Sequence, residues 1–417
     1  MNATEDSTKK HSASSAAAPS RSALLRFLDF ISSLKLTVVF LTLGVLLVFI
    51  GTLAQVDEGL YNAQNRYFRS LFIWWGPQGA GWSLPVFPGG YFVGGVQLIN
   101  LFAAHARRFK FSKKKIGIFI IHAGIVLMLV GQFATDLLSV ESQMQIFEGD
   151  TKNFSEDSRA CELALIDTSD PKHDRVYSVP AELLGKHSEI RDSRLPLTVR
   201  VKNYWPNASV FEEPPIKANI PPGSIKPQAT DGLFTNDYVL PRPVSTDMES
   251  RNLPAAVVEF ASANGPVASF LVYAGLITKQ SFTANGKSYD VALRFTRYQH
   301  PFNVTLLKAT HENYKGTEIP KNFASRVRVE NPERNEARET MIYMNNPLRY
   351  AGLTFFQYQM GADEMKMRPM DKRYTVLQVV RNPSWITPYL SCVMVAAGLI
   401  IQFMTHLVGF VMKRRKA

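Results

Sequence analysis

The stretch IGIFIIHAGIVLMLVGQFATDLL, residues 116–138, decides the fold class of this chain. It is apolar and long enough to cross a bilayer as a helix, which takes about 20 residues. Three further stretches share this property and run from Leu36 to Ala54, from Leu84 to Ala104 and from Ile386 to Val411, the last within a membrane segment of residues 385–412. The sequence therefore predicts an integral membrane protein with four transmembrane α-helices, at residues 36–54, 84–104, 116–138 and 385–412.

The charges predict how these helices are oriented. The whole chain has a formal net charge of +12, yet residues 140–384 hold 30 Lys and Arg against 29 Asp and Glu. Nearly all of the basic excess lies in the tail of residues 1–35, in the loop from Arg107 to Lys115, and in the tail of residues 413–417. With four spans these three places lie on one side, which the positive-inside rule makes cytoplasmic. We therefore expect cytoplasmic termini and an extracytoplasmic domain at residues 140–384, between the third and fourth helices.

That domain is predicted to be β-rich. Tyr289, Val291, Leu293 and Phe295 alternate with polar or small residues, a pattern typical of half-buried strands. Leu197, Val199 and Val201, and then Val327 and Val329, repeat it. Asn264-Gly265 and Asn285-Gly286 each separate two such runs, which predicts tight hairpins. Eight prolines between residues 206 and 243 indicate a long surface insertion instead of strands.

Several classes of function are disfavoured by the sequence. A nucleic-acid-binding domain would carry its basic excess on a folded surface, whereas here the excess flanks apolar runs, so no nucleic-acid partner is expected. Cys161 and Cys392 are the two cysteines, and the second lies in an apolar segment, which disfavours a disulfide framework. The chain has no Walker loop, nucleophile elbow or paired His/Cys metal spacing. We expect no independent catalytic activity and no catalytic residue.

His122 is the one titratable side chain deep inside the third span. Such a residue is costly in lipid unless it faces a partner, a cavity or a cofactor, and neutral imidazole is an axial ligand of haem iron. A histidine bonded to a neighbouring helix is the alternative, and both interpretations stay open. His406 has a similar predicted depth, and His105 ends the second span beside basic residues; both are weaker candidates. Gly117, Gly124 and Gly131 recur every seven residues and would admit another helix or a flat macrocycle.

Ordered segments along nearly the whole chain resemble one known family, the ResB/CcsB component of system II cytochrome c biogenesis. The segments are IGTLAQ (50–55), FPGG (87–90), NLFAAHARRF (100–109), HAGIVLMLVGQF (122–133), EGDTKNF (148–154), YKGTEIPKNFASRVRV (314–329) and MNNPLRYAGLTFFQYQM (344–360). No single segment is distinctive, but their order among the predicted spans makes the resemblance specific.

The resemblance implies a subunit that works with a ResC/CcsA-type membrane protein. Together they would carry haem b across the membrane and present it for covalent attachment to apocytochrome c. His122 matches the family's third-span histidine, which implies a bond from His122 to haem iron. The host membrane could be bacterial or plastid, and a short tail without transit-peptide character favours the bacterial cytoplasmic (inner) membrane, with a periplasmic domain and contact with membrane lipid. A docking scaffold without any haem ligand is the alternative function.

Overall fold

The structure of the protein is a computed structural model that describes residues 23–77, 81–108, 112–214, 219–245, 250–276, 278–317, 320–362 and 373–416. Two compact units make up the chain. The first, the helical unit, comprises residues 1–58, 63–129 and 389–417, and the second, the β-rich domain, comprises residues 59–62 and 130–388. Most of the predicted N-terminal tail (1–22), part of the predicted basic loop (109–111) and Ala417 lie outside the described residues.

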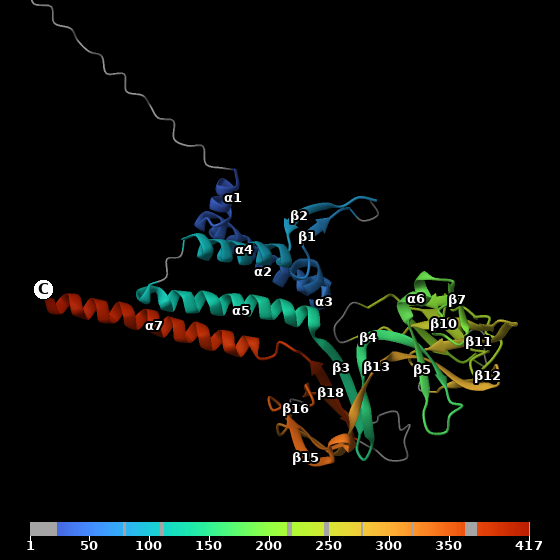
Figure 1. The fold of residues 1–417 in the computed structure, drawn as a ribbon. Helices are drawn as coiled ribbons and strands as arrows, with labels where there is room; N and C mark the ends of the chain where they lie inside the picture. Colours follow the sequence, from blue (N-terminus) through green and yellow to red (C-terminus); the bar gives the residue numbers. More distant parts are fainter. Residues whose placement is uncertain are drawn as a thin grey trace, which may run out of the picture. The chain divides into compact units, whose positions relative to one another are not determined.

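The helical unit is built from long helices and one short hairpin (Figure 1). Its elements are α1 (Ala23–Ile31), α2 (Leu34–Glu58), the π-helical turn η1 (Gln64–Phe68), β1 (Phe72–Trp75), β2 (Leu84–Pro88), α4 (Gly90–Arg108), the 3-10 turn η2 (Lys113–Lys115), α5 (Ile116–Leu138) and α7 (Thr387–Lys416). The short helix α3 (Leu60–Ala63) belongs to the β-rich domain except for Ala63. The last turns of α5 and the first residues of α7 belong to the β-rich domain.

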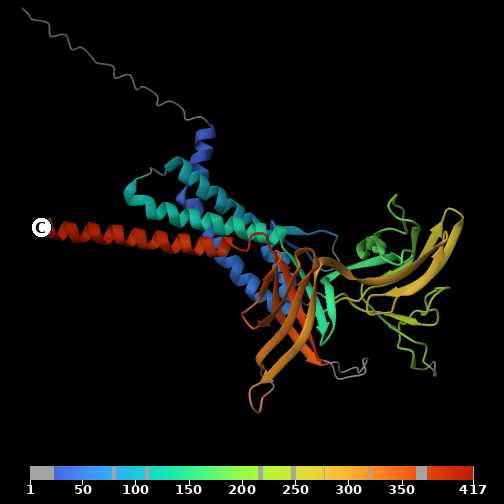
Figure 2. The same cartoon turned by 60° about the horizontal axis from the view of Figure 1, so that its bottom comes forward.

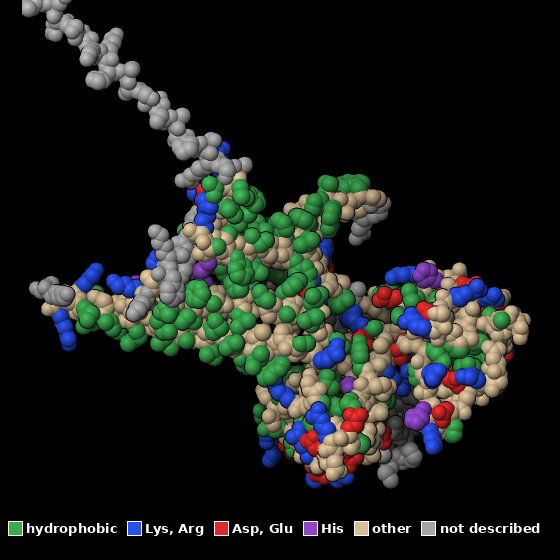
Figure 3. All heavy atoms as spheres, viewed as in Figure 1, with side chains coloured by type: hydrophobic (Ala, Val, Ile, Leu, Met, Phe, Trp, Pro, Cys, Tyr) green, Lys and Arg blue, Asp and Glu red, His purple; other side chains and the backbone are tan. Residues whose placement is uncertain are grey.

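Three helices of the described chain are long and apolar enough to cross a membrane: Leu34–Glu58, Ile116–Leu138 and Thr387–Arg415. Their large apolar side chains are turned outward; Val45 is 70% exposed and Phe403 is 66% exposed. On the face drawn in Figure 3, hydrophobic side chains cover these helices and the charged ones gather on the β-rich domain. Such surfaces are stable in lipid and costly in water, so helices that could cross a membrane are confirmed at three of the four predicted places.

The predicted second span differs from the structure at its start. Leu84 to Pro88 form strand β2, which pairs with β1 from Trp75–Leu84 to Phe72–Pro88, and the helix begins only at Gly90. Proline has no N–H for a helix interior, so Pro85 and Pro88 favour an edge strand here. The resulting α4 also carries Asn100, and it is not among the three membrane helices. A fourth crossing at α4 stays a prediction.

Asn100 joins α4 to the break between α1 and α2. Its side chain is only 3% exposed, and its amide nitrogen donates to the carbonyls of Ile31 (2.5 Å) and Ser33 (3.1 Å). Its amide oxygen accepts from the hydroxyl of Thr37 at 2.6 Å. The Ile31 carbonyl lies at the end of α1, where a helix leaves carbonyls unpaired, and the Ser33 carbonyl also accepts from the Thr37 N–H at 3.3 Å, so this asparagine ties α4 to the break between α1 and α2.

The β-rich domain contains a ten-stranded, a four-stranded and a two-stranded sheet, each built of antiparallel strand pairs. The strands are β3 (Val140–Phe147), β4 (Thr151–Asp167), β5 (Arg175–Pro180), β6 (Glu189–Ile190), β7 (Thr198–Trp205), β8 (Ala208–Phe211), β9 (Tyr238–Pro241), β10 (Ala255–Ser262), β11 (Gly265–Tyr273), β12 (Gln280–Ala284), β13 (Lys287–Asn313), β14 (Pro320–Asn331), β15 (Glu336–Tyr343), β16 (Leu348–Tyr350), β17 (Leu353–Ala362) and β18 (Arg373–Arg381). The short helix α6 (Ala181–Lys186) and the 3-10 turn η4 (Pro332–Arg334) complete it.

Strand β13 contributes side chains to both main cores of this domain, whereas β4, its long partner strand, contributes to the first (Figure 2). Their first pairing extends from Tyr289–Asp167 to Phe295–Cys161, after which a bulge shifts the register to Arg297–Glu156. Side chains of both strands before the bulge pack with β7, β10 and β11. Phe302 and later residues of β13 pack instead with β3, β14, β17 and β18. One continuous strand, β13, thus joins the two cores.

The strand and hairpin predictions are confirmed. Tyr289, Val291, Leu293 and Phe295 all lie on β13 and are buried. Asn285 and Gly286 both have positive φ, +50° and +75°, between β12 and β13, which is the geometry of a tight hairpin turn. The second predicted hairpin, at Gly265, joins β10 to β11. In the described part of the proline-rich stretch, which lacks residues 215–218, the strands are the short pair β8–β9.

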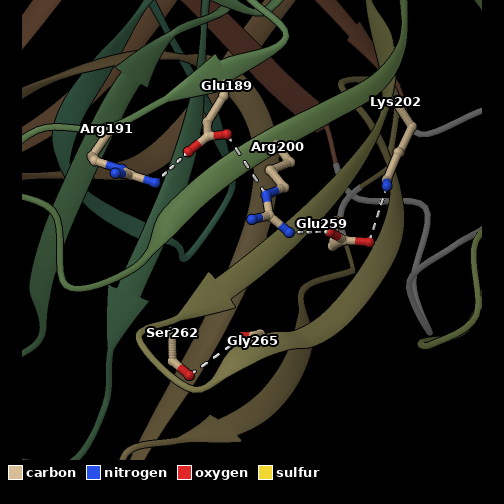
Figure 4. Close-up of polar contacts among 7 residues, drawn as sticks. All are labelled: Glu189, Arg191, Arg200, Lys202, Glu259, Ser262 and Gly265. Carbon is tan, nitrogen blue, oxygen red and sulfur yellow. Dashed lines mark hydrogen bonds and ion pairs between the residues drawn. The ribbon is translucent and has the colours of Figure 1, made fainter.

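A ladder of charges covers the outer side of strands β6, β7 and β10 (Figure 4). Glu259 pairs with Arg200 at 3.2 Å and with Lys202 at 3.1 Å, and Arg200 also approaches Glu189 at 3.8 Å. Arg200 and Lys202 are 40% and 51% exposed, so water screens their ion pairs. Exposed pairs of this kind contribute at most about 1 kcal/mol each.

Asp167 should make the stability of the β-rich domain depend on acid. The Lys287 ammonium, 2.7 Å away, and Ser169 lower the pKa of Asp167 to about 2. A carboxyl whose pKa falls on folding stabilises the fold above its unfolded pKa of about 3.9, and that contribution disappears as the pH falls to the folded pKa. We expect Asp167→Asn to lower the unfolding temperature at pH 6 but not at pH 2. A difference that persists unchanged at pH 2 would contradict this assignment.

Candidate functional site

The candidate site is centred on His122, which α5 carries inside the helical unit. Helix α5 begins at Ile116, so His122 lies about 9 Å along the helix from its first residue. The basic turn Lys113–Lys115 directly precedes the helix and marks the predicted cytoplasmic boundary. The imidazole is half-buried. It is therefore near one end of an apolar helix and partly accessible from its side.

The structure brings His105 and His122 together. Nδ1 of His122 lies 2.9 Å from Nε2 of His105, and the two rings meet edge to face with centroids 4.7 Å apart. Helix α4 ends at Arg108 and α5 begins at Ile116, so the two histidines flank a short connection between neighbouring helices. His105 is therefore a direct neighbour of His122.

The hydrogen bonds of His105 determine which nitrogen of His122 carries a lone pair. Nδ1 of His105 lies 2.9 Å from the carbonyl of Leu101, and because a carbonyl only accepts, this nitrogen carries the proton. Nε2 of a neutral His105 then accepts from Nδ1–H of His122. In a neutral His122 the lone pair is consequently on Nε2, which has no hydrogen-bond partner among the described residues.

This arrangement is similar to that of metal-binding histidines, with a second imidazole in place of the usual carboxylate, carbonyl or water acceptor. A ligating imidazole generally donates its other N–H to an acceptor, which fixes the tautomer and the ring orientation and makes the ligating nitrogen more basic. Here His105 is that acceptor and the Leu101 carbonyl in turn fixes His105. Nε2 of His122 is therefore chemically suited to bind a metal, while both ring nitrogens of His105 are already engaged.

The three glycines of α5 lie against α7. Of the two neighbours considered for this face, another helix or a flat macrocycle, the structure shows the helix. A Cβ added to Gly117 would lie 2.7 Å from the backbone oxygen of Gly398, and one added to Gly398 would lie 2.8 Å from the oxygen of Gly117. At Gly124 the same construction meets the backbone oxygen of Ser391 at 3.0 Å. Only glycine permits this approach. Gly131 likewise leaves room for Thr387.

His406 lies elsewhere on the helical unit. It is exposed on α7, and its Nε2 lies 2.8 Å from the side-chain amide nitrogen of Gln402, one turn earlier on the same helix. No hydrogen bond or ring contact joins His406 to His122 in the part of the chain that the structure describes. The geometry thus pairs His122 with His105 and leaves His406 separate.

The cysteines and the remaining histidines offer no second metal centre. Within the described ranges, no group of three or more His, Cys, Asp or Glu side chains could hold a metal ion. Both cysteines are free. Burial, and then the nearby Asp157 carboxylate, raise the pKa of Cys161 to about 12, so this thiol stays protonated and is a poor nucleophile at neutral pH.

The contact between the two histidines was not predicted from the sequence. Two antiparallel neighbours joined by a short connection bring residues at similar distances from that connection together, and His105 and His122 satisfy this relation. This spacing is the feature of the sequence from which the contact could have been predicted. The rotation of each helix about its axis, which decides whether the rings face each other, is set by packing that sequence spacing does not reveal.

Comparison with known proteins gives two matches. Residues 269–372, which run from β11 to beyond β17, match the ResB-like family. The chain is also 23% identical over 309 residues to Protein NrfI of Wolinella succinogenes, an alignment that covers 73% of this chain and 29% of that relative. The chain therefore spans about three tenths of the length of NrfI. The resemblance predicted from the ordered segments is confirmed, and residues 269–372 of this chain are a ResB-like sequence.

Proposed function

We propose that this protein is a haem-handling membrane subunit of a system II cytochrome c synthetase, in which His122 binds haem iron through Nε2. The ResB-like match and the similarity to NrfI support a role in cytochrome c biogenesis. The observation that carries the haem assignment is the chain of hydrogen bonds from the Leu101 carbonyl through His105 to His122. It orients one imidazole lone pair within a helix of membrane length.

Haem b is the cargo in this proposal. Its apolar macrocycle is soluble in the membrane interior, and the predicted depth of His122 places the ligand close to the cytoplasmic side, where haem would enter. The second axial ligand would come from a ResC/CcsA-type partner, since His105 is engaged with His122 and His406 lies apart. After transfer, the partner would present the haem to apocytochrome c. The inner membrane of a bacterium, with the β-rich domain on the periplasmic side, is the proposed location.

A second function is a docking scaffold without any haem ligand of its own. The observation that favours it is the location of the family match, which lies entirely in the β-rich domain and excludes α5. In that function the domain would bind the partner or apocytochrome c, and the His105–His122 pair would only join two helices. Histidines hydrogen-bonded across membrane helices are a known structural device.

Haem content distinguishes the two functions. The complex of this protein with its ResC/CcsA-type partner, and the partner alone, would be purified in detergent and compared by reduced-minus-oxidised absorbance spectra. A ligand in this subunit predicts more b-type haem per partner in the complex than in the partner alone. Equal occupancy in the two samples would contradict the haem-handling function and leave the scaffold. Partner content measured by quantitative immunoblot provides the normalisation.

A further inference from the structure

A pocket of about 430 Å³ lies in the β-rich domain at the end of the sheet from which the membrane helices leave. Its lining includes Val140 and Arg381, which are register partners on β3 and β18. Val140 follows the end of α5 at Leu138, and Arg381 precedes the start of α7 at Thr387. The volume is typical of sites for small molecules. We name this cavity the Arg381 pocket.

Within the β-rich domain, the Arg381 pocket lies next to residues of the kind found at a membrane–water interface. Thr135, in the last turn of α5, hydrogen-bonds to Ser384 at 2.6 Å, just past the end of β18. Trp385 follows, and the Arg349 guanidinium lies over its ring, 4.2 Å from the centroid. Tryptophan and arginine are typical anchors at a membrane interface. A molecule dissolved in the membrane would therefore have a short path to this pocket.

The base of the Arg381 pocket is apolar. Phe302 and Val379 are 2% and 1% exposed and belong to the second core of the domain, and Leu353 packs against that core. The His300 ring stacks on Phe302 with centroids 5.3 Å apart. Burial lowers the pKa of His300, so this ring is neutral at pH 7 and adds no positive charge. Phe302 and Val379 thus form a closed base, and the half-buried Leu353 with the exposed Pro301 and Ala351 offers the apolar surface.

Its rim holds two guanidinium groups, those of Arg297 and Arg381. Arg297 is already neutralised by Glu156, whose carboxylate oxygen lies 3.0 Å from Nε. Burial, followed by a hydrogen bond to Asp157, raises the pKa of Tyr298 to about 12, so its hydroxyl stays protonated. Arg381 is exposed and has no ion-pair partner among the described residues. Its guanidinium is therefore available to an anion such as a carboxylate or phosphate.

The turn that borders the pocket is strained. Ala351 has φ +49° and precedes Gly352 with φ +78°, between β16 and β17. For alanine this conformation costs roughly 1 kcal/mol or more, and strain of this kind concentrates at ligand sites and clamps. The Arg349–Trp385 contact holds the same turn beside the start of α7. The backbone of Ala351 and Gly352, at the wall of the pocket, is therefore held in an energetically unfavourable conformation.

We infer that the Arg381 pocket binds an amphipathic anion that arrives from the membrane. The anionic head pairs with Arg381, and the apolar body lies against Pro301, Ala351 and Leu353, the lining side chains that present apolar surface. Two molecules share this chemistry: haem, through its carboxylates, and an anionic phospholipid, through its phosphate. The inference does not depend on His122, because the pocket is built only from residues of the β-rich domain.

The test uses the full chain in detergent, with His122→Ala in every sample so that the proposed membrane site does not contribute. One arm titrates ferric haem and, as its control, the haem dimethyl ester, which keeps the macrocycle and iron but lacks free carboxylates. The other arm titrates a short-chain phosphatidylglycerol against the zwitterionic phosphatidylcholine. Absorbance reports the haem arm and calorimetry reports the lipid arm.

Arg381→Gln should weaken the binding of the true ligand about tenfold, and Arg381→Lys should restore most of it, since a charge-assisted bond is lost and then returned. Arg373→Gln is the matched control, because it removes the same charge from the other end of β18. If Arg381→Gln weakens the binding of haem but not that of its dimethyl ester, Arg381 binds a carboxylate. If it weakens the binding of phosphatidylglycerol but not that of phosphatidylcholine, Arg381 binds a phosphate. Absence of binding in both arms, or equal effects of Arg381→Gln and Arg373→Gln, would overturn the inference.

Discussion

Replacing His122 by glycine should reduce the b-type haem of the complex with its ResC/CcsA-type partner by about 100-fold at a fixed haem concentration, and added imidazole should restore part of it. The glycine variant removes the proposed iron ligand and leaves a space that free imidazole can enter. Changes in residues that only orient a ligand typically cost 10–100-fold in metal affinity, so loss of the ligand itself should cost at least as much. Absorbance spectra of the purified complex, recorded with and without imidazole, measure both effects.

His105 should act through His122 and so have a smaller effect of a different kind. His105→Phe keeps a ring of similar size but removes the acceptor for Nδ1–H of His122. The ligating imidazole then donates less electron density, and the haem midpoint potential should rise while haem content falls about tenfold. His406→Phe is the matched control, since this exposed histidine contacts Gln402 on its own helix. If the His122→Gly variant kept the wild-type haem content and midpoint potential, His122 would not be a haem ligand.

Replacing Glu162 by alanine should destabilise the β-rich domain by about 3–5 kcal/mol. Glu162 and Arg294 lie opposite each other on β4 and β13, with Oε1 and Nε 3.0 Å apart, and their side chains are only 6% and 14% exposed. Glu162 also accepts from the hydroxyl of Ser178 at 2.5 Å. The alanine variant leaves the Arg294 charge without its partner away from water, and breaking a buried pair in this way costs this much.

The surface ladder of Figure 4 provides the control for this prediction. Glu259→Ala also removes a carboxylate with two basic partners, but those partners are half exposed and the loss should stay near or below 1 kcal/mol. Glu162→Leu combined with Arg294→Leu removes both charges and should recover much of the lost stability. Thermal unfolding of the full chain in detergent measures the differences. Equal losses for Glu162→Ala and Glu259→Ala would show that burial of the pair is unimportant.

The fold was predictable from the sequence where the signal is local. Membrane helices at α2, α5 and α7 follow from uninterrupted apolar runs, and the hairpin at Asn285-Gly286 follows from two residues that accept positive φ. The start of α4 was not predictable in this way. Leu84 to Pro88 are apolar enough for a helix or a strand, and only their pairing with β1 decides between the two.

The candidate site was predictable only in part for the same reason. His122 stands out because a titratable side chain in an apolar run is unusual, and that observation needs no knowledge of other helices. Its contact with His105 and the choice of α7 as the partner of Gly117 depend on how distant segments pack. To predict the Arg381 pocket, the packing of five strands would have to be known, since its lining comes from β3, β4, β13, β17 and β18.

The continuity of β13 has a consequence for any attempt to divide this protein into modules. This strand passes from one core to the other without an intervening loop. A deletion that spared one core would cut β13 in two and leave unpaired strand edges open to other chains. Shuffling, fusion or truncation can therefore respect the borders of the β-rich domain but finds no neutral seam inside it.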